Sequence, residues 1–437
     1  MTAPRPAAGP RVLPRWQATR AATRRFFDET LAPGAYTARP IALRHPFVFY
    51  EGHLAAFAVI KLLREALGRP AIDPELETLF ERGIDPPAEE SGHPERRWPS
   101  REDVRDYVRK ADSAVEDALG SGALAGAEQH ETVLMVLEHE LMHQETLRYM
   151  LHRLPYPEKR APHAAPPPEA SARAPRRETV SIPTGVATLG ARRGDLEFGW
   201  DNEFPQVRLS VPAFAIDVLP VTNSEFLEFV DAGGYREPAF WGPGDAEWLA
   251  SHEISHPPFW RHAGDGWLWV GQFDLLPLPE SWPVWVSHAE ASAYARWKGR
   301  RLPTEAEFHR AAFGTAGGTE RPFPWGDEPP APAHGNFGGD RDDPVPVGSR
   351  PEGTSAWGVQ DLIGNGWEWT STPFAGFDGF APMASYPAYS ADFFDGRHFV
   401  LKGASPATPG PLVRRTFRNW FQARYPYVFA KFRCVEP

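Results

Sequence analysis

Hydrophobic residues recur at helical spacing through the first third of the chain. Apolar side chains follow the 3.6-residue repeat in residues 57–63 and again in residues 133–137, and this spacing predicts helices. Ser100, with two acidic residues in the turn that follows, is typical of a helix N-cap. That helix should continue to about Leu119 and end at the glycine-rich turn after it. Three or four such helices predict a bundle.

The pattern changes at a stretch rich in alanine and proline. In residues 158–177, 11 of 20 positions are Ala or Pro, a composition that buries too little apolar surface to fold and that proline keeps extended. Beyond it, short segments alternate with Gly and Pro, and helical spacing returns only around residues 223–230 and 287–312. This pattern of short segments predicts an α+β domain and not a doubly wound one. We therefore expect a helical domain in residues 1–155, a linker in 156–177 and an α+β domain in 178–437.

Composition excludes several classes of protein. The net charge of -11 argues against nucleic-acid binding, which needs a basic surface. The chain lacks an apolar run of the ~20 residues that a membrane helix needs, so we expect neither a nucleic-acid nor a membrane partner. Cys434 is the single cysteine, which excludes a disulfide framework and fits a reducing cytoplasm. Its strand-like Phe-Arg-Cys context predicts a buried packing residue.

Two histidines four residues apart form the main candidate for chemistry. His139 and His143 lie in one of the predicted helices, where this spacing brings both imidazoles to the same face and within reach of one metal ion. With Glu140, they match the His-Glu-x-x-His signature of zinc proteases, in which the glutamate is the general base. A metalloprotease would need a third ligand downstream, where His152 and His163 are the candidates.

The C-terminal half carries an ordered series of specific motifs. They include Asp-Asn-Glu-Phe-Pro at residues 201–205, Gly-Arg-Arg-Leu-Pro-Thr-Glu-Ala-Glu at 299–307 and Gly-Asn-Gly-Trp-Glu-Trp-Thr at 364–370. The series resembles the formylglycine-generating-enzyme (sulfatase-modifying factor) domain, which implies a C-type-lectin-like fold over about residues 178–437. That family's own activity requires a pair of active-site cysteines, and Cys434 stands alone.

The combination of the two halves resembles the sulfoxide synthases of ergothioneine and ovothiol biosynthesis. In that family a DinB-like helical bundle precedes this domain, and three histidines hold Fe(II). The resemblance implies that His53, His139 and His143 are the iron ligands. In the segment at residues 49–57, His53 aligns with the family's iron ligand, and Tyr50 aligns with a position where the family has another histidine. Gln144 and Glu145 are expected to orient a ligand or to tie the helix to a neighbour.

One departure from the family affects the expected proton donor. A tyrosine that the family brings to the iron corresponds here to Phe377, whose side chain can neither donate a proton nor hydrogen-bond. Tyr425 and Tyr427 are candidate catalytic replacements near the substrate motif, and Tyr50 and Tyr107 are candidates from the bundle.

Further departures concern the substrates. Asn419 and Trp420 match the family's substrate-binding stretch, and an aromatic wall suits a trimethylammonium group through cation–π attraction. The substrate-binding candidates are Asn419, Trp420, Phe421, Arg424, Phe377, Met142 and Trp98. In the family, a γ-glutamyl donor is recognised by charged residues at or next to the positions of Phe421, Arg424 and Trp98. In this chain those charged residues are largely missing. Free cysteine is therefore the more economical sulfur donor.

The resemblance implies an Fe(II)- and O2-dependent enzyme acting on small molecules. It would join a thiol, cysteine, to the imidazole carbon of hercynine (Nα-trimethylhistidine) or histidine. A selenoneine-type synthase with a selenosugar donor and a thiol dioxygenase are alternatives within the same architecture. Alternatives from other classes are a zinc metalloprotease and a non-catalytic ligand-binding module. The sequence leaves the oligomeric state open.

Overall fold

The computed structural model describes residues 9–81, 98–161, 175–264 and 266–437. The chain divides into two compact units, Met1–Ala164 and Ala165–Pro437, each of which is considered by itself. Within the described residues, no helix combines the length and the apolar character that a membrane span requires.

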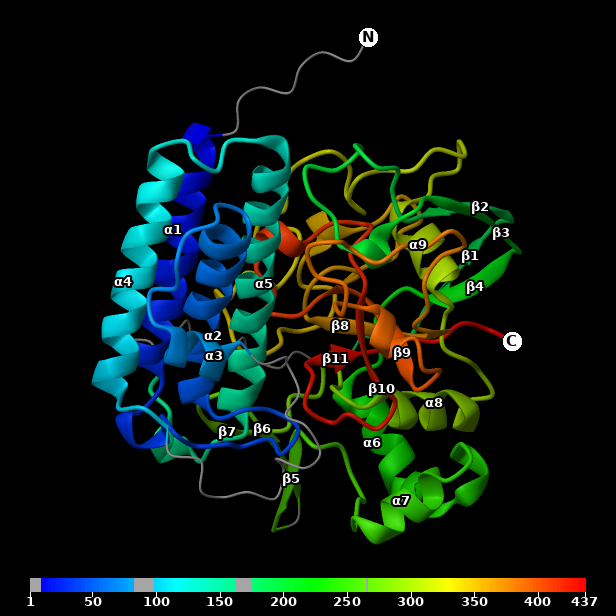
Figure 1. Ribbon diagram of the computed structural model, residues 1–437. Helices are drawn as coiled ribbons and strands as arrows, with labels where there is room; N and C mark the ends of the chain where they lie inside the picture. Colours follow the sequence, from blue (N-terminus) through cyan, green and yellow to red (C-terminus); the bar gives the residue numbers. More distant parts are fainter. Residues whose placement is uncertain (1–8, 82–97, 162–174, 265) are drawn as a thin grey trace. The chain divides into compact units, whose positions relative to one another are not determined.

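The first unit is built from helices, as predicted (Figure 1). They are α1 (Gly9–Arg25), η1 (Phe26–Thr30), η2 (Pro33–Ala35), α2 (Phe47–Ala58), η3 (Val59–Glu65), α3 (Pro74–Phe80), α4 (Arg101–Gly120), α5 (Ala127–His152) and η5 (Tyr156–Glu158). All 12 residues of α2 are buried, because α3, α4 and α5 pack around this helix. The π-helical segment η3 continues it without a break.

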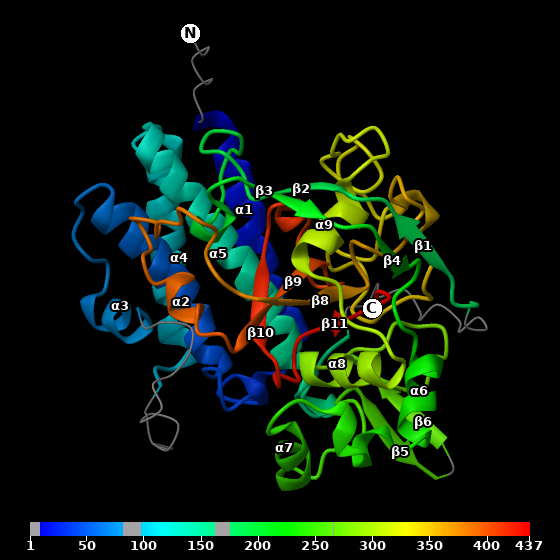
Figure 2. The same cartoon turned by 90° about the vertical axis from the view of Figure 1, so that its right-hand side faces the viewer.

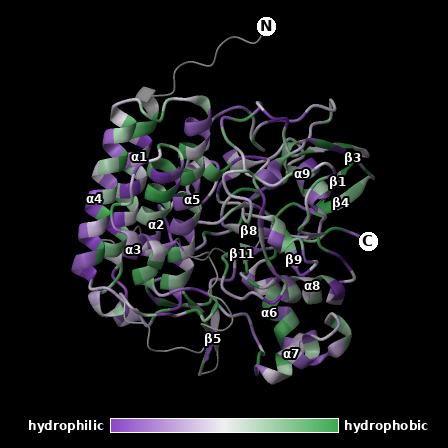
Figure 3. Cartoon of the chain, viewed as in Figure 1, coloured by the Kyte–Doolittle hydropathy of each residue, from purple (hydrophilic) through white to green (hydrophobic). Residues whose placement is uncertain are grey.

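Helix α4 shows how the hydrophobic pattern determines the packing. Its buried residues include Val104, Val108, Ala111 and Val115, which recur every three or four positions, whereas its other side is hydrophilic (Figure 3). The predicted cap is confirmed, since the Ser100 hydroxyl accepts a hydrogen bond from the backbone N–H of Asp103. The helix therefore begins and ends where the sequence predicts.

The start of the expected linker is hydrogen-bonded to the helical unit. Lys159 forms a β-bridge with Leu31, its ammonium group donates to the His152 carbonyl at 2.8 Å, and the Arg160 N–H donates to the Thr30 carbonyl at 2.8 Å. The part of the predicted linker at residues 162–174 lies outside the described residues.

The second unit combines short strands with modest helices, as an α+β domain should. Its strands are β1 (Thr179–Ile182), β2 (Gly185–Leu189), β3 (Val207–Val211), β4 (Phe214–Asp217), β5 (Trp260–Ala263), β6 (Gly266–Val270), β7 (Leu275–Pro277), β8 (Gly366–Pro373), β9 (His398–Ala404), β10 (Asn419–Gln422) and β11 (Ala430–Lys431). Its longer helices are α6 (Asn223–Asp231), α7 (Asp245–Ser251), α8 (His288–Trp297) and α9 (Glu305–Phe313).

The helical pattern of residues 287–312 is divided between α8 and α9. The two helices are separated by a turn in which Gly299 has a φ of 65°, a conformation that favours glycine. Ser287 and Thr304 cap the two helices, each as part of a capping box. A single helix over this range is therefore not formed.

The largest sheet has the strand order β10-β9-β8-β11, and its strands can be followed in Figure 2. The β10–β9 and β9–β8 pairs are antiparallel, and β11 runs parallel to β8. Buried ion pairs join β11 and the residue Arg433 to β8: the Glu368 carboxylate accepts hydrogen bonds from Arg433 at 2.6 Å and from Lys431 at 3.1 Å. Because β10 is an edge strand of this sheet, Asn419 and Trp420 stand on a defined edge.

Candidate functional site

Helices α2 and α5 bring His53, His139 and His143 together. One ring nitrogen of each lies within 4.8 Å of those of the other two. The Nε2 atoms of His139 and His143 are 3.2 Å apart, as expected for residues separated by one turn. The ring centroid of His53 lies 5.2 Å from that of His139 and 5.3 Å from that of His143. The structure therefore gathers the three predicted histidines into one cluster.

The orientation of His53 is fixed by a backbone group. Its Nδ1 lies 2.7 Å from the carbonyl oxygen of Phe80, at the end of α3. Because a carbonyl oxygen can only accept, Nδ1 carries the proton and Nε2 keeps its lone pair. Nε2 is buried and has no hydrogen-bond partner among the residues that the structure describes. A buried lone pair in this state suits a metal ion.

Burial keeps the three imidazoles neutral. It lowers the pKa of His53 from 6.5 to about 4, and it lowers the pKa values of His139 and His143 well below 6.5, with further repulsion from the neighbouring histidines. Neutral imidazole is the form that binds transition metals. This set of donors fits a first-row transition metal, with coordination positions left for other ligands.

Aromatic side chains surround the cluster. Phe57 stacks on His139 with ring centroids 3.8 Å apart, and Phe49 stacks on His53 at 5.0 Å. The Tyr50 ring lies 5.4 Å from that of His143, so this candidate tyrosine is beside the histidines. Trp98 is one layer further out, where it packs on Phe49.

Two further candidates of this unit have different surroundings. Met142 is half-buried on α5, between the two histidines in sequence. Tyr107 is buried on α4, where burial and the nearby carboxylate of Glu77 raise the pKa of its hydroxyl.

The carboxylate of Glu140 is engaged elsewhere. Its Oε1 atom accepts hydrogen bonds from Arg20 at 3.0 Å and from the Thr23 hydroxyl at 2.5 Å, both on α1. One turn further along α5, Gln144 is also bonded to α1: its amide donates to the Thr23 hydroxyl at 3.1 Å. Glu145 is also buried. A general base needs an accessible lone pair near the metal, so this arrangement disfavours the metalloprotease alternative.

In the second unit, Asn419, Trp420 and Phe421 lie on β10. The Trp420 ring stacks on Phe374 with centroids 4.2 Å apart and an interplanar angle of 5°. Tyr389 and Phe393 approach it at 5.3 Å and 5.6 Å. Trp420 is therefore part of an aromatic cluster, whereas the Oδ1 atom of Asn419 accepts a hydrogen bond from the Trp420 N–H at 2.9 Å.

The remaining candidates near this strand form a second aromatic group and an ion pair. Tyr425 is buried; it stacks on Phe421 at 4.9 Å and meets Tyr427 edge-on at 5.0 Å. The Arg424 guanidinium pairs with Asp245 at 2.8 Å. That arginine therefore already has a carboxylate partner within its own unit.

Phe377 lies against a buried arginine. The Arg418 guanidinium is 4.3 Å from the centre of the Phe377 ring and makes a two-pronged ion pair with Glu305 at 2.9 Å and 3.0 Å. It also donates to the carbonyls of Asn202 and Ala375. Arg418 thus joins three chain segments beside Asn419, which explains structurally why an arginine precedes the predicted substrate motif.

Several contributing groups were not found from the sequence. The Phe80 carbonyl is a backbone atom, which has no residue-type signature. Thr23 and Arg20 lie in a helix with little patterning, and nothing there marks them as partners of residues more than a hundred positions away. Phe374 and Tyr389 could have been suspected only from the general aromatic richness of this domain.

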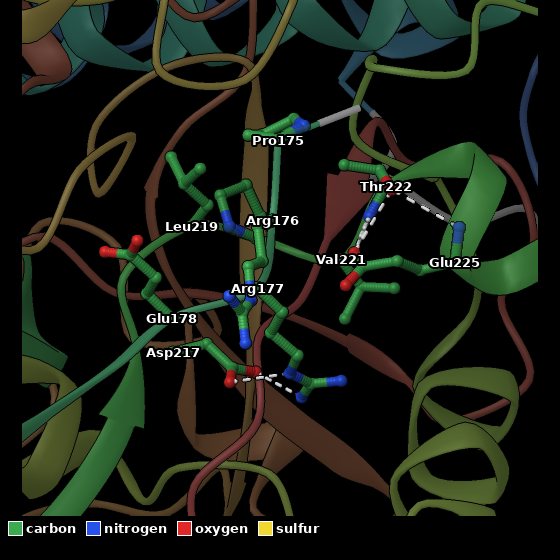
Figure 4. Close-up of a pocket in the computed structure, with 10 residues that line it drawn as sticks. Pro175, Arg176, Arg177, Glu178, Asp217, Leu219, Val221, Thr222 and Glu225 are labelled. Atoms are coloured by element: carbon green, nitrogen blue, oxygen red, sulfur yellow. Dashed lines mark hydrogen bonds and ion pairs between the residues drawn. The ribbon is translucent and has the colours of Figure 1, made fainter. Parts of the chain in front are cut away.

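A pocket in the second unit is lined by other residues (Figure 4). It contains about 270 Å³ of empty space and includes Arg177, Asp217, Thr222 and Glu225 in its wall. Arg177 is already paired with Asp217 at 2.5 Å. None of the predicted site residues lines this pocket.

Comparison with known proteins supports the assignment of both units to one family. Residues 164–437 match the family model of the sulfatase-modifying factor enzyme 1-like domain. A hercynine oxygenase of Mycolicibacterium thermoresistibile is 36% identical over 90% of this chain and 87% of the relative. A hercynine oxygenase of Mycobacterium tuberculosis is 36% identical over 76% of this chain and 77% of the relative. Ergothioneine biosynthesis protein 1 of Neurospora crassa is 28% identical over 91% of this chain and 54% of the relative.

The second unit thus has the sulfatase-modifying-factor type of domain, and the helical unit adds a buried three-histidine cluster. The chain belongs to the hercynine oxygenase family of sulfoxide synthases and is an enzyme, as the sequence predicted.

Proposed function

We propose that this enzyme holds Fe(II) on His53, His139 and His143 and joins a thiol to the imidazole carbon of hercynine, with O2 as the oxidant. The family membership supports ergothioneine-type chemistry. The single observation that carries the metal centre is the cluster of three buried, neutral histidines. In this proposal the helical unit is DinB-like and the second unit is C-type-lectin-like.

Fe(II), when bound, supplies the redox activity toward O2 that Zn(II) lacks. The protein's own contribution is to prepare the ligands. The Phe80 carbonyl holds His53 with its Nε2 lone pair available, and the surrounding phenyl rings exclude water from the three imidazoles. Glu140 is tied through Oε1 to Arg20 and Thr23 of α1, which argues against its acting as the base of a hydrolytic metal centre.

The edge strand β10 is proposed to bind the histidine-derived substrate. Trp420 is half-buried and stacks with one face on Phe374, so its other face would meet a trimethylammonium group, which favours hercynine over histidine. Asn419 would contribute its amide to the polar part of the same substrate.

Free cysteine is the proposed sulfur donor. The larger donor, γ-glutamylcysteine, presents an additional carboxylate that requires a cationic partner. Arg424, the nearest family counterpart, is already paired with Asp245, and Phe421 is uncharged. A small donor is therefore the better match to these residues.

A product analysis tests the proposal. Fe(II)-loaded enzyme is incubated in air with hercynine and cysteine, and the products are measured by mass spectrometry together with O2 consumption. We expect a product with the mass of both substrates plus one oxygen and less two hydrogens, which balances O2 consumption with release of one water. The Zn(II)-loaded enzyme is the matched control and should consume no O2.

Other outcomes point to the alternatives. Cysteine sulfinate without the coupled product would favour a thiol dioxygenase, a reading that the missing hydroxyl at Phe377 specifically supports. Absence of O2 consumption with cysteine, but coupling with a selenosugar, would identify a selenoneine-type synthase. Absence of both reactions would contradict the proposed function.

A further inference from the structure

The face of α5 next to the metal-binding face is hydrogen-bonded to α1, and the Thr23 hydroxyl takes part in two of these bonds. Glu140 follows His139, and Gln144 follows His143. The Thr23 hydroxyl donates to Glu140 Oε1 at 2.5 Å and accepts from Gln144 Nε2 at 3.1 Å. The same Gln144 amide donates to the Thr19 carbonyl at 3.0 Å. One threonine thus contacts the residue after each of the two histidines.

An ion-pair network reinforces this contact. Arg20 donates through Nη1 to Glu140 at 3.0 Å and through Nε to Asp112 of α4 at 2.7 Å. Arg20, Glu140 and Thr23 are each at most 3% exposed, and Asp112 is 6% exposed. Hydrogen bonds between buried, oppositely charged groups are strongly directional, so α1, α4 and α5 are linked in a defined register.

Helix geometry connects this contact to the histidines. Successive residues are 100° apart around a helix, so the pair 140 and 144 is displaced by one such step from the pair 139 and 143. A histidine ring nitrogen lies roughly 6 Å from the helix axis, and a rotation of α5 by about 10° would move it by about 1 Å. Binding sites need their ligands within about 0.5 Å of the productive geometry.

We propose that Thr23, Glu140 and Gln144 are positioning residues that fix the rotation of α5 and thereby set the metal affinity of His139 and His143. This inference rests on the proposed metal centre and goes beyond it, because none of the three residues belongs to the histidine cluster itself. It assigns to the glutamate of the His-Glu-x-x-His string a role in holding the helix, in place of the role of general base.

The test compares two substitutions of Thr23. Thr23→Val keeps the shape and removes the hydroxyl, and Thr23→Ser keeps the hydroxyl. Thr132→Val is the matched control on α5, because the Thr132 hydroxyl donates within its own helix, to the Glu128 carbonyl at 3.1 Å. Each full-length variant is titrated with Co(II), whose visible spectrum reports coordination geometry, and then with Fe(II) in competition.

We expect Thr23→Val to weaken Co(II) and Fe(II) binding by about tenfold or more, the usual range for groups that orient ligands, and to alter the spectrum of bound Co(II). Thr23→Ser should restore both to nearly the wild-type values, and Thr132→Val should leave them unchanged. If Thr23→Val does not fold, Gln144→Met, which removes the amide and keeps the length, serves the same comparison.

Two results would overturn the inference in distinguishable ways. Wild-type affinity and spectrum in Thr23→Val and Gln144→Met, while His139→Ala loses binding, would overturn the positioning role and leave the metal centre intact. Failure of the wild-type enzyme to bind either metal would overturn the metal centre and the positioning role together.

Discussion

At the scale of single residues, the neutrality of the imidazoles is the property on which the proposed centre depends. Burial holds the pKa of His53 near 4 and those of His139 and His143 far below 6.5. A metal ion therefore meets no competing proton at pH 7. The pair on α5 could be predicted because a spacing of four residues fixes a common helix face. The carbonyl that orients His53 could not, since every residue has one.

Removal of one ligand should abolish the centre. His139→Ala leaves two imidazoles, and we expect the Fe(II) content to fall from about one ion per chain to the background level, with loss of O2 consumption. Metal analysis of the reconstituted, desalted protein measures this. His130→Ala, on the same helix at a half-buried position, is the control. Full iron occupancy in His139→Ala would contradict the ligand assignment.

A second prediction concerns Phe377. In Phe377→Tyr the new hydroxyl would extend from a ring that packs against Arg418, and a phenol can donate the proton that a phenyl ring cannot. We expect the ratio of coupled product to cysteine sulfinate to rise by about tenfold, a modest value for a general acid. Mass spectrometry of the reaction mixture provides the ratio. Phe380→Tyr in the same turn is the control, and an unchanged ratio in Phe377→Tyr would exclude this position as the proton donor.

At the scale of elements, the close packing of α2 and α3 determines the position of the Phe80 carbonyl. Gly52 has no side chain, and a Cβ atom there would lie 2.3 Å from the Phe80 ring. The glycine therefore permits the approach that brings the Phe80 carbonyl within 2.7 Å of His53 Nδ1. This is a packing constraint between segments far apart in sequence, so it could not be derived from the helical pattern.

Gly52→Ala should loosen both the packing and the metal site. The added methyl group must displace Phe80, and overpacking of this kind costs about 1–3 kcal/mol of unfolding free energy. We also expect weaker Fe(II) binding, because the displaced carbonyl would no longer orient His53. Urea unfolding and metal titration measure the two effects. Gly120→Ala at the end of α4, where a Cβ meets open space, should have neither.

The elements also show where pattern analysis succeeds. Helix α4 has an alternation of buried and exposed residues and a side-chain cap, and both its ends were predicted. The helical spacing at residues 287–312 corresponds to two helices, α8 and α9, because the left-handed turn at Gly299 interrupts it. A glycine inside a helical pattern leaves both outcomes open, and only tertiary packing decides between them.

At the scale of the whole molecule, buried histidines occur in both units and make stability depend on pH. In the second unit, burial lowers the pKa of His288 to about 3, and its ring stacks on Phe399 at 3.8 Å. Since its pKa in the folded enzyme lies below the ordinary 6.5, the unfolded chain takes up the proton first. The stabilisation is therefore complete above pH 6.5 and is lost as the pH falls toward 3.

We predict that the unfolding free energy of the metal-free enzyme decreases as the pH is lowered from 6.5 to 4.5. Each buried histidine with a lowered pKa contributes at most about 1.4 kcal/mol per pH unit. His288→Gln should reduce this slope. Urea unfolding followed by tryptophan fluorescence is suitable, because 14 of the 16 tryptophans follow residue 177. His252→Gln, at an exposed position, is the control, and an equal reduction in both variants would contradict the assignment to His288.

The single cysteine gives this enzyme an internal reporter. Cys434 is fully buried, and burial raises the pKa of its thiol to about 12. Thiolate is the species that attacks disulfides and alkylating reagents, so the folded protein should be inert toward cystine. Modification then requires an opening of the second unit. The rate at which an aromatic disulfide labels Cys434 would measure how often that unit opens under conditions in which the enzyme is working.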